Sequence, residues 1–141
     1  MEIQRKKATV DELNALSKNT MLETLGIRIT KVEDGLLEGT MPVDHRTHQP
    51  YGILHGGASV VLAESLGSIA AQLYAPEGHF CVGLDINANH IRSVRSCTVT
   101  GRATPIHLGR TTQVWEIKIT SEDDKLVCIS RLTIAVVQKV K

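Results

Sequence analysis

Alternating apolar and polar residues predict an antiparallel sheet in the C-terminal half of this sequence. The stretch Val-Trp-Glu-Ile-Lys-Ile at residues 114–119 alternates at every position, as a strand with one buried face does. Turn residues separate such stretches, so we expect strands at residues 80–92, 96–106, 111–120 and 126–138. Nearer the N-terminus, apolar runs at residues 27–32 and 36–43 flank Asp34-Gly35, and Asp-Gly between such runs indicates a hairpin.

The helical signals are one short helix and one long helix. Thr9 is a suitable cap for a helix at residues 9–16, where apolar residues follow helical spacing. Residues 56–75 are rich in alanine and leucine and contain no proline before Pro76, and their apolar residues lie nearly all round the helix axis. We therefore expect an α+β fold in which a long antiparallel sheet wraps around one central helix, with a short N-terminal helix.

Length and composition are those of an ordinary globular protein. The 141 residues suit a single domain, residues 1–141, and no apolar run approaches the roughly 20 residues of a membrane span. The first residues lack the apolar segment of a secretory signal, and three widely spaced cysteines do not make a disulfide framework. We expect a reduced, cytoplasmic protein without a membrane segment.

The net charge of +1 conceals one uneven stretch. Residues 86–115 contain four arginines and two histidines but no aspartate or glutamate, so the rest of the chain is net acidic. A local basic stretch is compatible with a phosphate site or with solvated arginines, and charge alone leaves both open. With one Trp, two Tyr and one Phe, the chain has no aromatic platform for nucleic acid, and we expect no nucleic-acid partner.

A single charged residue, Glu64, interrupts the long apolar helix. An unpaired buried carboxylate is unfavourable, so Glu64 is either an exposed point of the helix or a group kept for chemistry. Ser68 follows on the same helix face, one turn later. Just before the helix lie Gln49, His55 and Gly56-Gly57. Free N–H groups at a helix start attract developing negative charge, as an oxyanion site requires, although paired glycines also serve tight turns.

The spacing of these groups keeps them apart within one chain. His55 and Glu64 are nine residues apart, so on a helix they lie on opposite faces and roughly 13 Å from each other. Two antiparallel copies of the helix across a twofold axis bring Glu64 of one subunit to His55 and Gly56 of the other. We therefore expect a homodimer with two equivalent sites, and a function that depends on dimerisation.

Other catalytic patterns are absent from the sequence. It contains no G-x-S-x-G motif of serine hydrolases and no glycine-rich nucleotide motif. His45 and His48 have poor spacing for zinc and no cysteine nearby, so we expect no metal site. The three cysteines lie in strand-like runs and fit core positions better than nucleophiles.

Six segments together resemble the hotdog-fold acyl-CoA thioesterases. They are residues 41–44 (Met-Pro-Val-Asp), 46–50 (Arg-Thr-x-Gln-Pro), 54–57 (Leu-His-Gly-Gly), 62–68 (Leu-Ala-Glu-Ser-x-Gly-Ser), 82–90 (Val-Gly-Leu-Asp-Ile-Asn-Ala-Asn-His) and 106–110 (Ile-His-Leu-Gly-Arg). The likeness spans about residues 13–136 and is strongest to the bacterial branch with the 1,4-dihydroxy-2-naphthoyl-CoA hydrolase of menaquinone synthesis and the enterobactin proofreading thioesterase. The His-Gly-Gly element is moderately specific alone, and Gln49 before it and Glu64 after it make the match specific.

The resemblance implies the fold expected above, homodimers that assemble into homotetramers, and active sites between subunits. Glu64 matches the catalytic carboxylate, acting as nucleophile or general base, and Gly56 matches the residue whose N–H polarises the thioester carbonyl. Gln49 and His55 match helpers near the carbonyl and the thiol, and Ser68 matches an assisting hydroxyl. The residues matched to the coenzyme A end are Gly83, His90, Ile91, Arg92, Ser93, His107, Leu108, Gly109, Arg110, Thr111 and Thr112. All of these except Gly83 fall in the acid-free stretch.

The resulting hypothesis is hydrolysis of aryl- or acyl-CoA thioesters to the free acid and coenzyme A, with an aromatic acyl group such as 1,4-dihydroxy-2-naphthoyl or benzoyl as first choice. The coenzyme A thioester is the substrate, and no cofactor is expected. Alternatives are a thioesterase for acyl groups on an acyl or aryl carrier protein, or a non-hydrolytic acyl-CoA binding module. Hotdog hydratases typically use an Asp/His pair instead, and Glu64 on the helix favours hydrolysis. The acyl group, its carrier, the pathway and the choice between nucleophile and base stay open.

Overall fold

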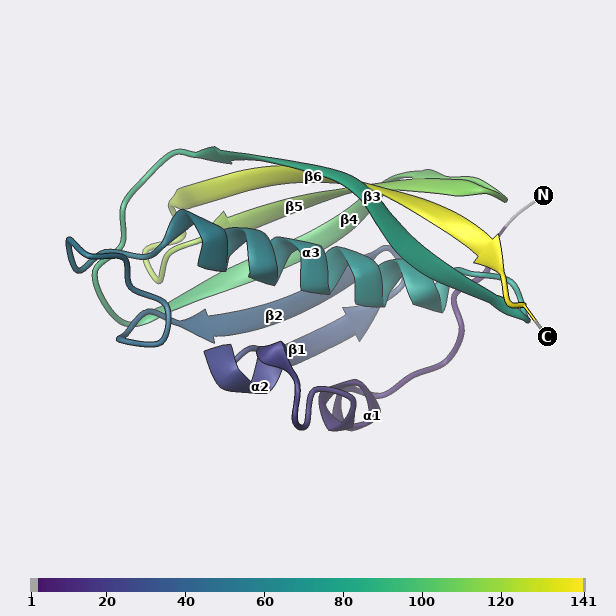
Figure 1. Cartoon of the computed structure of the whole chain (residues 1–141), viewed down its shortest axis with the longest axis horizontal. Coiled ribbons are helices and arrows are strands. Elements are labelled where there is room, and N and C mark those ends of the chain that lie inside the picture. Colours follow the sequence, from purple (N-terminus) through teal and green to yellow (C-terminus); the bar gives the residue numbers. More distant parts are fainter. Residues whose placement is uncertain (1–2, 141) are drawn as a thin grey trace.

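A computed structural model describes residues 3–140, in which a sheet curls around one long helix (Figure 1). The elements in chain order are α1 (Val10–Ala15), α2 (Met21–Leu25), β1 (Arg28–Glu33), β2 (Leu36–Pro42), α3 (Gly56–Leu73), β3 (His79–His90), β4 (Thr98–Leu108), β5 (Thr112–Thr120) and β6 (Leu126–Gln138). This architecture confirms the predicted α+β fold with a central helix. Within the described residues, no helix is long and apolar enough to cross a membrane.

The six strands form one antiparallel sheet in the order β1-β2-β4-β5-β6-β3. In β5, Trp115, Ile117 and Ile119 are fully buried, whereas Lys118 between them is exposed, as the alternation in the sequence predicts. The chain leaves β2, passes through α3 and enters the sheet again as β3, which pairs only with β6. β1 and β3 are therefore the two edge strands.

Glycines on two neighbouring strands let α3 lie close to the middle of the sheet. A Cβ atom on Gly39 of β2 would lie 2.8 Å from the Leu66 side chain, and one on Gly101 of β4 would lie 2.7 Å from it. Leu66 is fully buried at this point.

The side of α3 that carries Glu64 is only half-buried, whereas the apolar residues in the sequence predict a helix that is buried on nearly all sides. The reason is that this side is flanked only in part, by the short α2 and by the edge strand β3.

The structure contains one short helix, α2, that the apolar pattern does not predict. Thr20 caps its start, because Oγ1 accepts a hydrogen bond from the Leu22 N–H at 3.3 Å, and Gly26 ends it in the left-handed conformation with a φ of 74°. Five residues are too few to display helical periodicity, so these two caps are the only available signal. The other predicted elements are confirmed, with ends shifted by no more than two residues.

The two edges of the sheet differ in how their backbone groups are paired. At the β1 edge, the Asn14 side chain accepts a hydrogen bond from the Ile29 N–H at 2.8 Å and donates one to the Ile29 carbonyl at 2.9 Å. At the β3 edge, Gln72 of α3 accepts a hydrogen bond from the Cys81 N–H at 3.0 Å. Further along, at residues 83–90, no described side chain bonds to the backbone of that edge. This part of β3 is an open edge on which another strand can pair.

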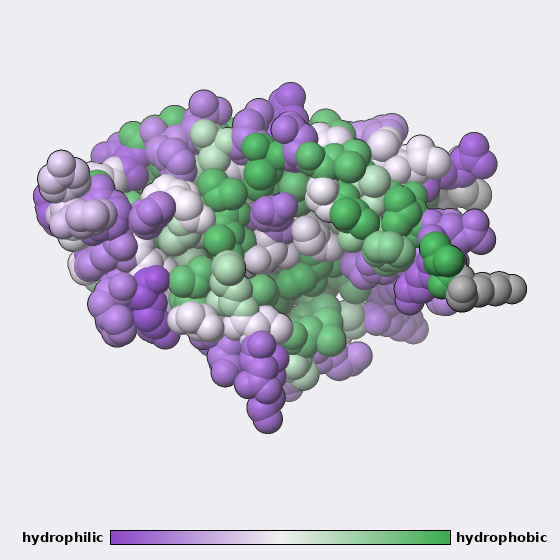
Figure 2. Space-filling model, in the orientation of Figure 1, coloured by the Kyte–Doolittle hydropathy of each residue, from purple (hydrophilic) through white to green (hydrophobic). Residues whose placement is uncertain are grey.

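β3 also carries exposed apolar side chains. Phe80, Val82 and Leu84 have exposed fractions of 39%, 42% and 62%. In the orientation of Figure 1, apolar residues gather across the surface over α3 and β3 (Figure 2). An exposed apolar strand at an open edge is typical of a protein interface.

Candidate active site

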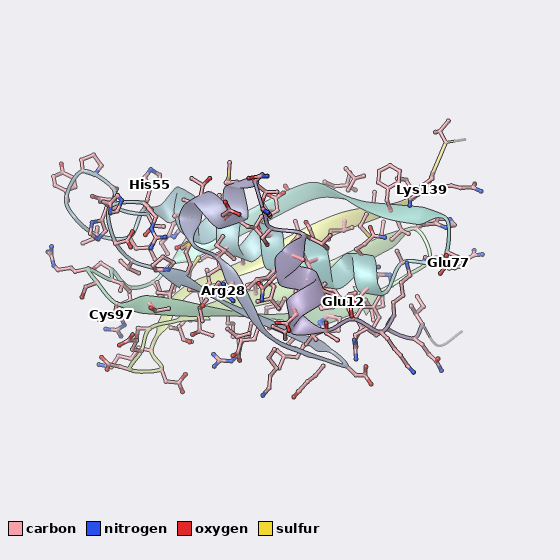
Figure 3. The ribbon with its side chains drawn as sticks, turned by 90° about the horizontal axis from the view of Figure 1, so that it is seen from below. Glu12, Arg28, His55, Glu77, Cys97 and Lys139 are labelled. Carbon is pink, nitrogen blue, oxygen red and sulfur yellow. The ribbon has the colours of Figure 1, made fainter. Side chains whose placement is uncertain are left out.

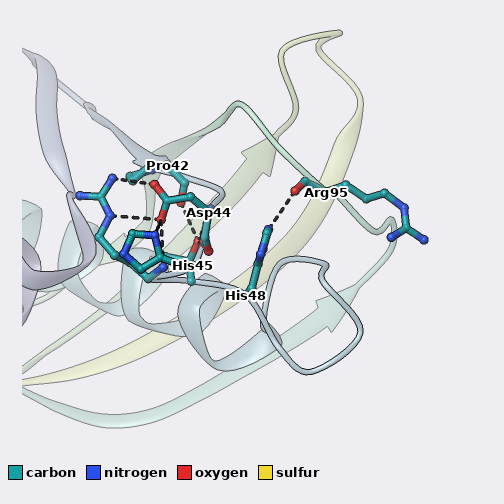
Figure 4. A network of polar contacts seen from close by, with 7 residues as sticks. Pro42, Asp44, His45, His48 and Arg95 are labelled. Atoms are coloured by element: carbon teal, nitrogen blue, oxygen red, sulfur yellow. Dashed lines mark hydrogen bonds and ion pairs between the residues drawn. The ribbon is translucent and has the colours of Figure 1, made fainter.

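The loop at residues 43–55, between β2 and α3, is held together by its own side chains (Figure 4). Arg46 donates from Nε to Asp44 Oδ1 at 3.1 Å and from Nη2 to Asp44 Oδ2 at 2.7 Å. These side-chain hydrogen bonds, together with one from the Arg46 backbone N–H, hold the pKa of Asp44 well below its ordinary value. The buried Thr47 donates to the Pro42 carbonyl at 2.7 Å. The residues that follow, up to the start of α3, are thereby fixed in place.

His55 caps α3 at one end of the molecule, far from Glu77 in the turn that follows the helix (Figure 3). Its Nδ1 accepts a hydrogen bond from the Gly57 N–H at 2.7 Å. Because Nδ1 is the acceptor, the neutral ring carries its proton on Nε2. His55 therefore presents a hydrogen-bond donor on the side away from the helix.

The neighbouring Gly56 N–H has a different environment from that of Gly57. No acceptor in the part of the chain that the structure describes receives the Gly56 N–H. This amide belongs to the first residue of an 18-residue helix, where the helix dipole adds partial positive charge. Of the two glycines, Gly56 is the one whose N–H is available to a developing oxyanion.

A cavity of about 270 Å³ lies beside Gly56. A Cβ atom on Gly56 would lie 2.9 Å from Nε2 of His90, so glycine leaves room for this imidazole at the helix start. The lining residues are Gln49, Ile53, Leu54, Gly56, Ser59, His90, Ile91, Arg92, Ser93 and Val127. The structure thus brings together candidates from the loop before α3 and candidates from the end of β3.

Gln49 contributes a second donor to this cavity. Its Oε1 accepts a hydrogen bond from the Tyr51 backbone N–H. The carboxamide acceptor is therefore engaged within the loop, and the NH₂ group is the end that can donate to a ligand.

Glu64 lies in a separate groove of about 430 Å³ on the half-buried side of α3. The groove is lined by Met21, Leu22, Val61, Glu64, Ser65, Ser68 and Ile69. None of the described residues forms an ion pair or hydrogen bond with the Glu64 carboxylate. A Cβ atom on Gly83 would lie 3.0 Å from Glu64 Oε1, so the carboxylate lies against the backbone of the open β3 edge. The carboxylate and Ser68 share the groove, as the helical spacing predicts.

A single chain therefore does not bring Glu64 and Gly56 into one cavity. Glu64 lies eight positions after Gly56, which corresponds to about 12 Å along α3. Each lies against a different part of β3, Glu64 at Gly83 and Gly56 at His90.

The remaining candidates lie at a third place, the turn between β4 and β5 and the strand ends on either side of it. These are His107, Leu108, Gly109, Arg110, Thr111 and Thr112. The Gly109 N–H donates to the Thr112 carbonyl at 2.9 Å, and the Thr111 carbonyl accepts from the Val136 N–H at 2.9 Å. Thr112 pairs with Ala135 of β6, which in turn pairs with Val82 at the start of β3. Within one chain, this turn is far along the sheet from the Arg92 and Ser93 segment.

Sequence reasoning missed the apolar wall opposite Glu64. Met21 and Leu22 of α2 line the groove, together with Val61 and Ile69 of α3. The α3 positions follow from helical spacing around Glu64, whereas the α2 positions depend on a helix whose only signal is its caps.

Comparisons with known proteins give one consistent family. A profile described as "Thioesterase superfamily" matches residues 51–128. The chain is 52% identical over 134 residues to the 1,4-dihydroxy-2-naphthoyl-CoA hydrolase of Escherichia coli K12, covering 95% of this chain and 98% of that protein. It is 52% identical over 132 residues to the proofreading thioesterase EntH of Klebsiella pneumoniae, covering 94% and 96%. A crystal structure of the thioesterase HI1161 from Haemophilus influenzae is similar with a TM-score of 0.95 and 53% identity, covering 99% and 98%.

Proposed function

The chain belongs to the thioesterase superfamily and is a thioester hydrolase, and from this premise we propose that it cleaves aryl- or acyl-CoA thioesters to the free acid and coenzyme A. The observation that carries the proposal is the free Gly56 N–H at the start of α3, next to a cavity that holds basic residues of the acid-free stretch. An aromatic acyl group is the first choice, because the Glu64 groove has apolar walls and a relative of 52% identity is named a naphthoyl-CoA hydrolase.

In the proposed reaction, the Gly56 N–H stabilises the oxyanion that forms on the thioester carbonyl. The Glu64 carboxylate either attacks the carbonyl carbon, forming an acyl–Glu64 anhydride that water then hydrolyses, or removes a proton from a water molecule that attacks the carbonyl carbon. In both routes the coenzyme A thiolate leaves. We propose that the Gln49 NH₂ group and His55 Nε2, the donors that these two side chains keep available, assist at the carbonyl and the sulfur. Incorporation of ¹⁸O from water into Glu64 during one turnover would identify the nucleophilic route.

The site is proposed to form between two chains that pair through their open β3 edges. Glu64 lies at Gly83 and Gly56 at His90, so an antiparallel β3 pair with its twofold axis between Ile86 and Asn87 sets Gly83 of one chain opposite His90 of the other. Glu64 of one chain then faces Gly56 of its partner, which a single chain cannot achieve. The edge capped by Asn14 is closed to such pairing, and this favours β3.

The same dimer would bring together the two segments that we propose bind coenzyme A. Antiparallel pairing places the partner's segment just after β3, with Arg92 and Ser93, beside the start of this chain's β3 near Val82. Thr112 lies two strands away from Val82, or about 10 Å at ordinary strand spacing. We propose that Arg92 and Arg110 bind the phosphates of coenzyme A, and this pairing brings them toward each other across the subunit boundary.

We also propose that two such dimers associate into a homotetramer. Phe80, Val82 and Leu84 expose apolar side chains, and a second dimer would cover the apolar surface left after the first pairing.

Complementation between two inactive variants tests the shared site. Glu64→Ala and Gly56→Pro chains, carrying different affinity tags, are co-expressed and their heterodimers purified. Because one of the two sites in such a heterodimer has both Glu64 and the Gly56 N–H intact, thiol release from benzoyl-CoA should reach about half of the wild-type rate.

The parent homodimers of each variant serve as controls for that experiment. If Glu64 and Gly56 acted within the same chain, every subunit of the heterodimer would carry a defect, and the heterodimer would be as inactive as its parents. Failure of wild-type protein to release thiol from any aryl- or acyl-CoA would contradict the proposed substrate class itself.

A further inference from the structure

Two loops border the cavity at the start of α3, and one side chain joins them. The loop at residues 43–55 carries Gln49, and the loop at residues 91–97 carries Arg92 and Ser93. His48 Nε2 lies 2.8 Å from the Arg95 carbonyl oxygen (Figure 4). Because a carbonyl only accepts, the imidazole donates from Nε2. Among the described residues, no other side chain forms a hydrogen bond between these two loops.

Backbone contacts hold the loop at residues 91–97 on either side of this point. The Val94 carbonyl accepts a hydrogen bond from the Leu54 N–H at 2.8 Å, and the Cys97 carbonyl accepts one from the Val43 N–H at 2.8 Å. These backbone contacts do not depend on side-chain identity. Between these two backbone hydrogen bonds, the contact at the Arg95 carbonyl is the one that depends on the identity of a side chain, that of His48.

We propose that His48 is a positioning residue for the coenzyme A end of the substrate. Its hydrogen bond to Arg95 sets the separation between Gln49, the next residue in the chain, and the turn that carries Arg92 and Ser93. His48 does not line the cavity, so it acts through the Arg95 main chain rather than by touching the substrate. The inference rests on the proposed function, because the cavity is taken to hold an acyl-CoA.

The first measurement compares wild-type protein and His48→Ala on two thioesters of the same acid. With benzoyl-CoA, KM should rise about three- to tenfold, the size of one net hydrogen bond, with kcat changed by less than about twofold. With the benzoyl thioester of N-acetylcysteamine, which lacks the nucleotide, the KM values of the two proteins should be equal. A general loss of loop structure would instead impair both substrates and lower kcat.

Two further variants separate the hydrogen bond from other effects. His48→Gln keeps a donor at similar reach and should return KM for benzoyl-CoA to within about twofold of wild type. Arg95→Ala removes a side chain that points away from His48 but keeps the carbonyl, so KM should stay unchanged (Figure 4).

Different results would contradict the role of His48 and the proposed thioesterase activity. Equal KM values for wild type and His48→Ala on benzoyl-CoA would overturn the positioning role while leaving the thioesterase proposal intact. A KM increase in Arg95→Ala as large as that in His48→Ala would assign the effect to the guanidinium instead and also overturn it. Absence of both cleavage and binding of CoA thioesters by wild-type protein would refute the two proposals together.

Discussion

Replacing Glu64 with glutamine is expected to lower kcat for acyl-CoA hydrolysis by about 10²- to 10⁴-fold, which is the usual contribution of a positioned general base. Glutamine keeps the size and shape of the side chain but neither removes a proton from water nor attacks a carbonyl. Since no described residue forms an ion pair with Glu64, the substitution leaves no buried charge without its partner. The variant should therefore fold, with a melting temperature no lower than that of wild type.

Binding and turnover need separate measurements on this variant. The Kd for a CoA thioester, measured by calorimetry, should stay close to the wild-type value because the donors at Gln49, His55 and Gly56 are untouched. Glu77→Gln is a matched control, since Glu77 is exposed and lies at the other end of α3 from His55 (Figure 3). Turnover of Glu64→Gln near the wild-type rate would show that the carboxylate is not the reacting group.

The fold was predictable from the sequence because its strongest signals are local. Strict alternation around Trp115 gives a half-buried strand, Asp34-Gly35 gives the hairpin, and the alanine-rich stretch before Pro76 gives the single long helix. The sequence did not predict α2, because a single turn of helix shows no periodicity. Met21 and the apolar wall opposite Glu64 could therefore not be predicted either.

The candidate site was predictable only as two separate halves. Helical spacing alone requires that Glu64 and Gly56 lie apart in one chain, and the structure places them in different hollows. Which edge can bring them together depends on tertiary contacts, since Asn14 closes one edge by bonding to Ile29, 15 residues away. The contact between His48 and Arg95 joins residues 47 positions apart and has no signature in local sequence.

Replacing Gly56 with proline is expected to lower kcat by about 10²- to 10³-fold relative to Gly56→Ala, the usual loss for one oxyanion donor. Proline removes the backbone N–H and nothing else that α3 needs, because Gly56 is the first residue of the helix, where proline is well tolerated. The preceding residue, His55, has φ −70° and ψ 130°, a conformation that proline favours in its neighbour. The helix should therefore keep its start and its cap.

Alanine at the same position is the matched control for crowding. Both substitutions place a Cβ atom 2.9 Å from His90 Nε2, so both must displace the imidazole by a similar amount. Their KM values should rise together, whereas only the proline variant lacks the N–H that faces the oxyanion. The ratio of the two kcat values thus isolates the contribution of one amide hydrogen.

Equal kcat values in the proline and alanine variants, with equal helix content by circular dichroism, would exclude the Gly56 N–H as the donor to the oxyanion. The oxyanion would then have to be stabilised by side-chain donors, of which Gln49 and His55 are the nearest in the loop.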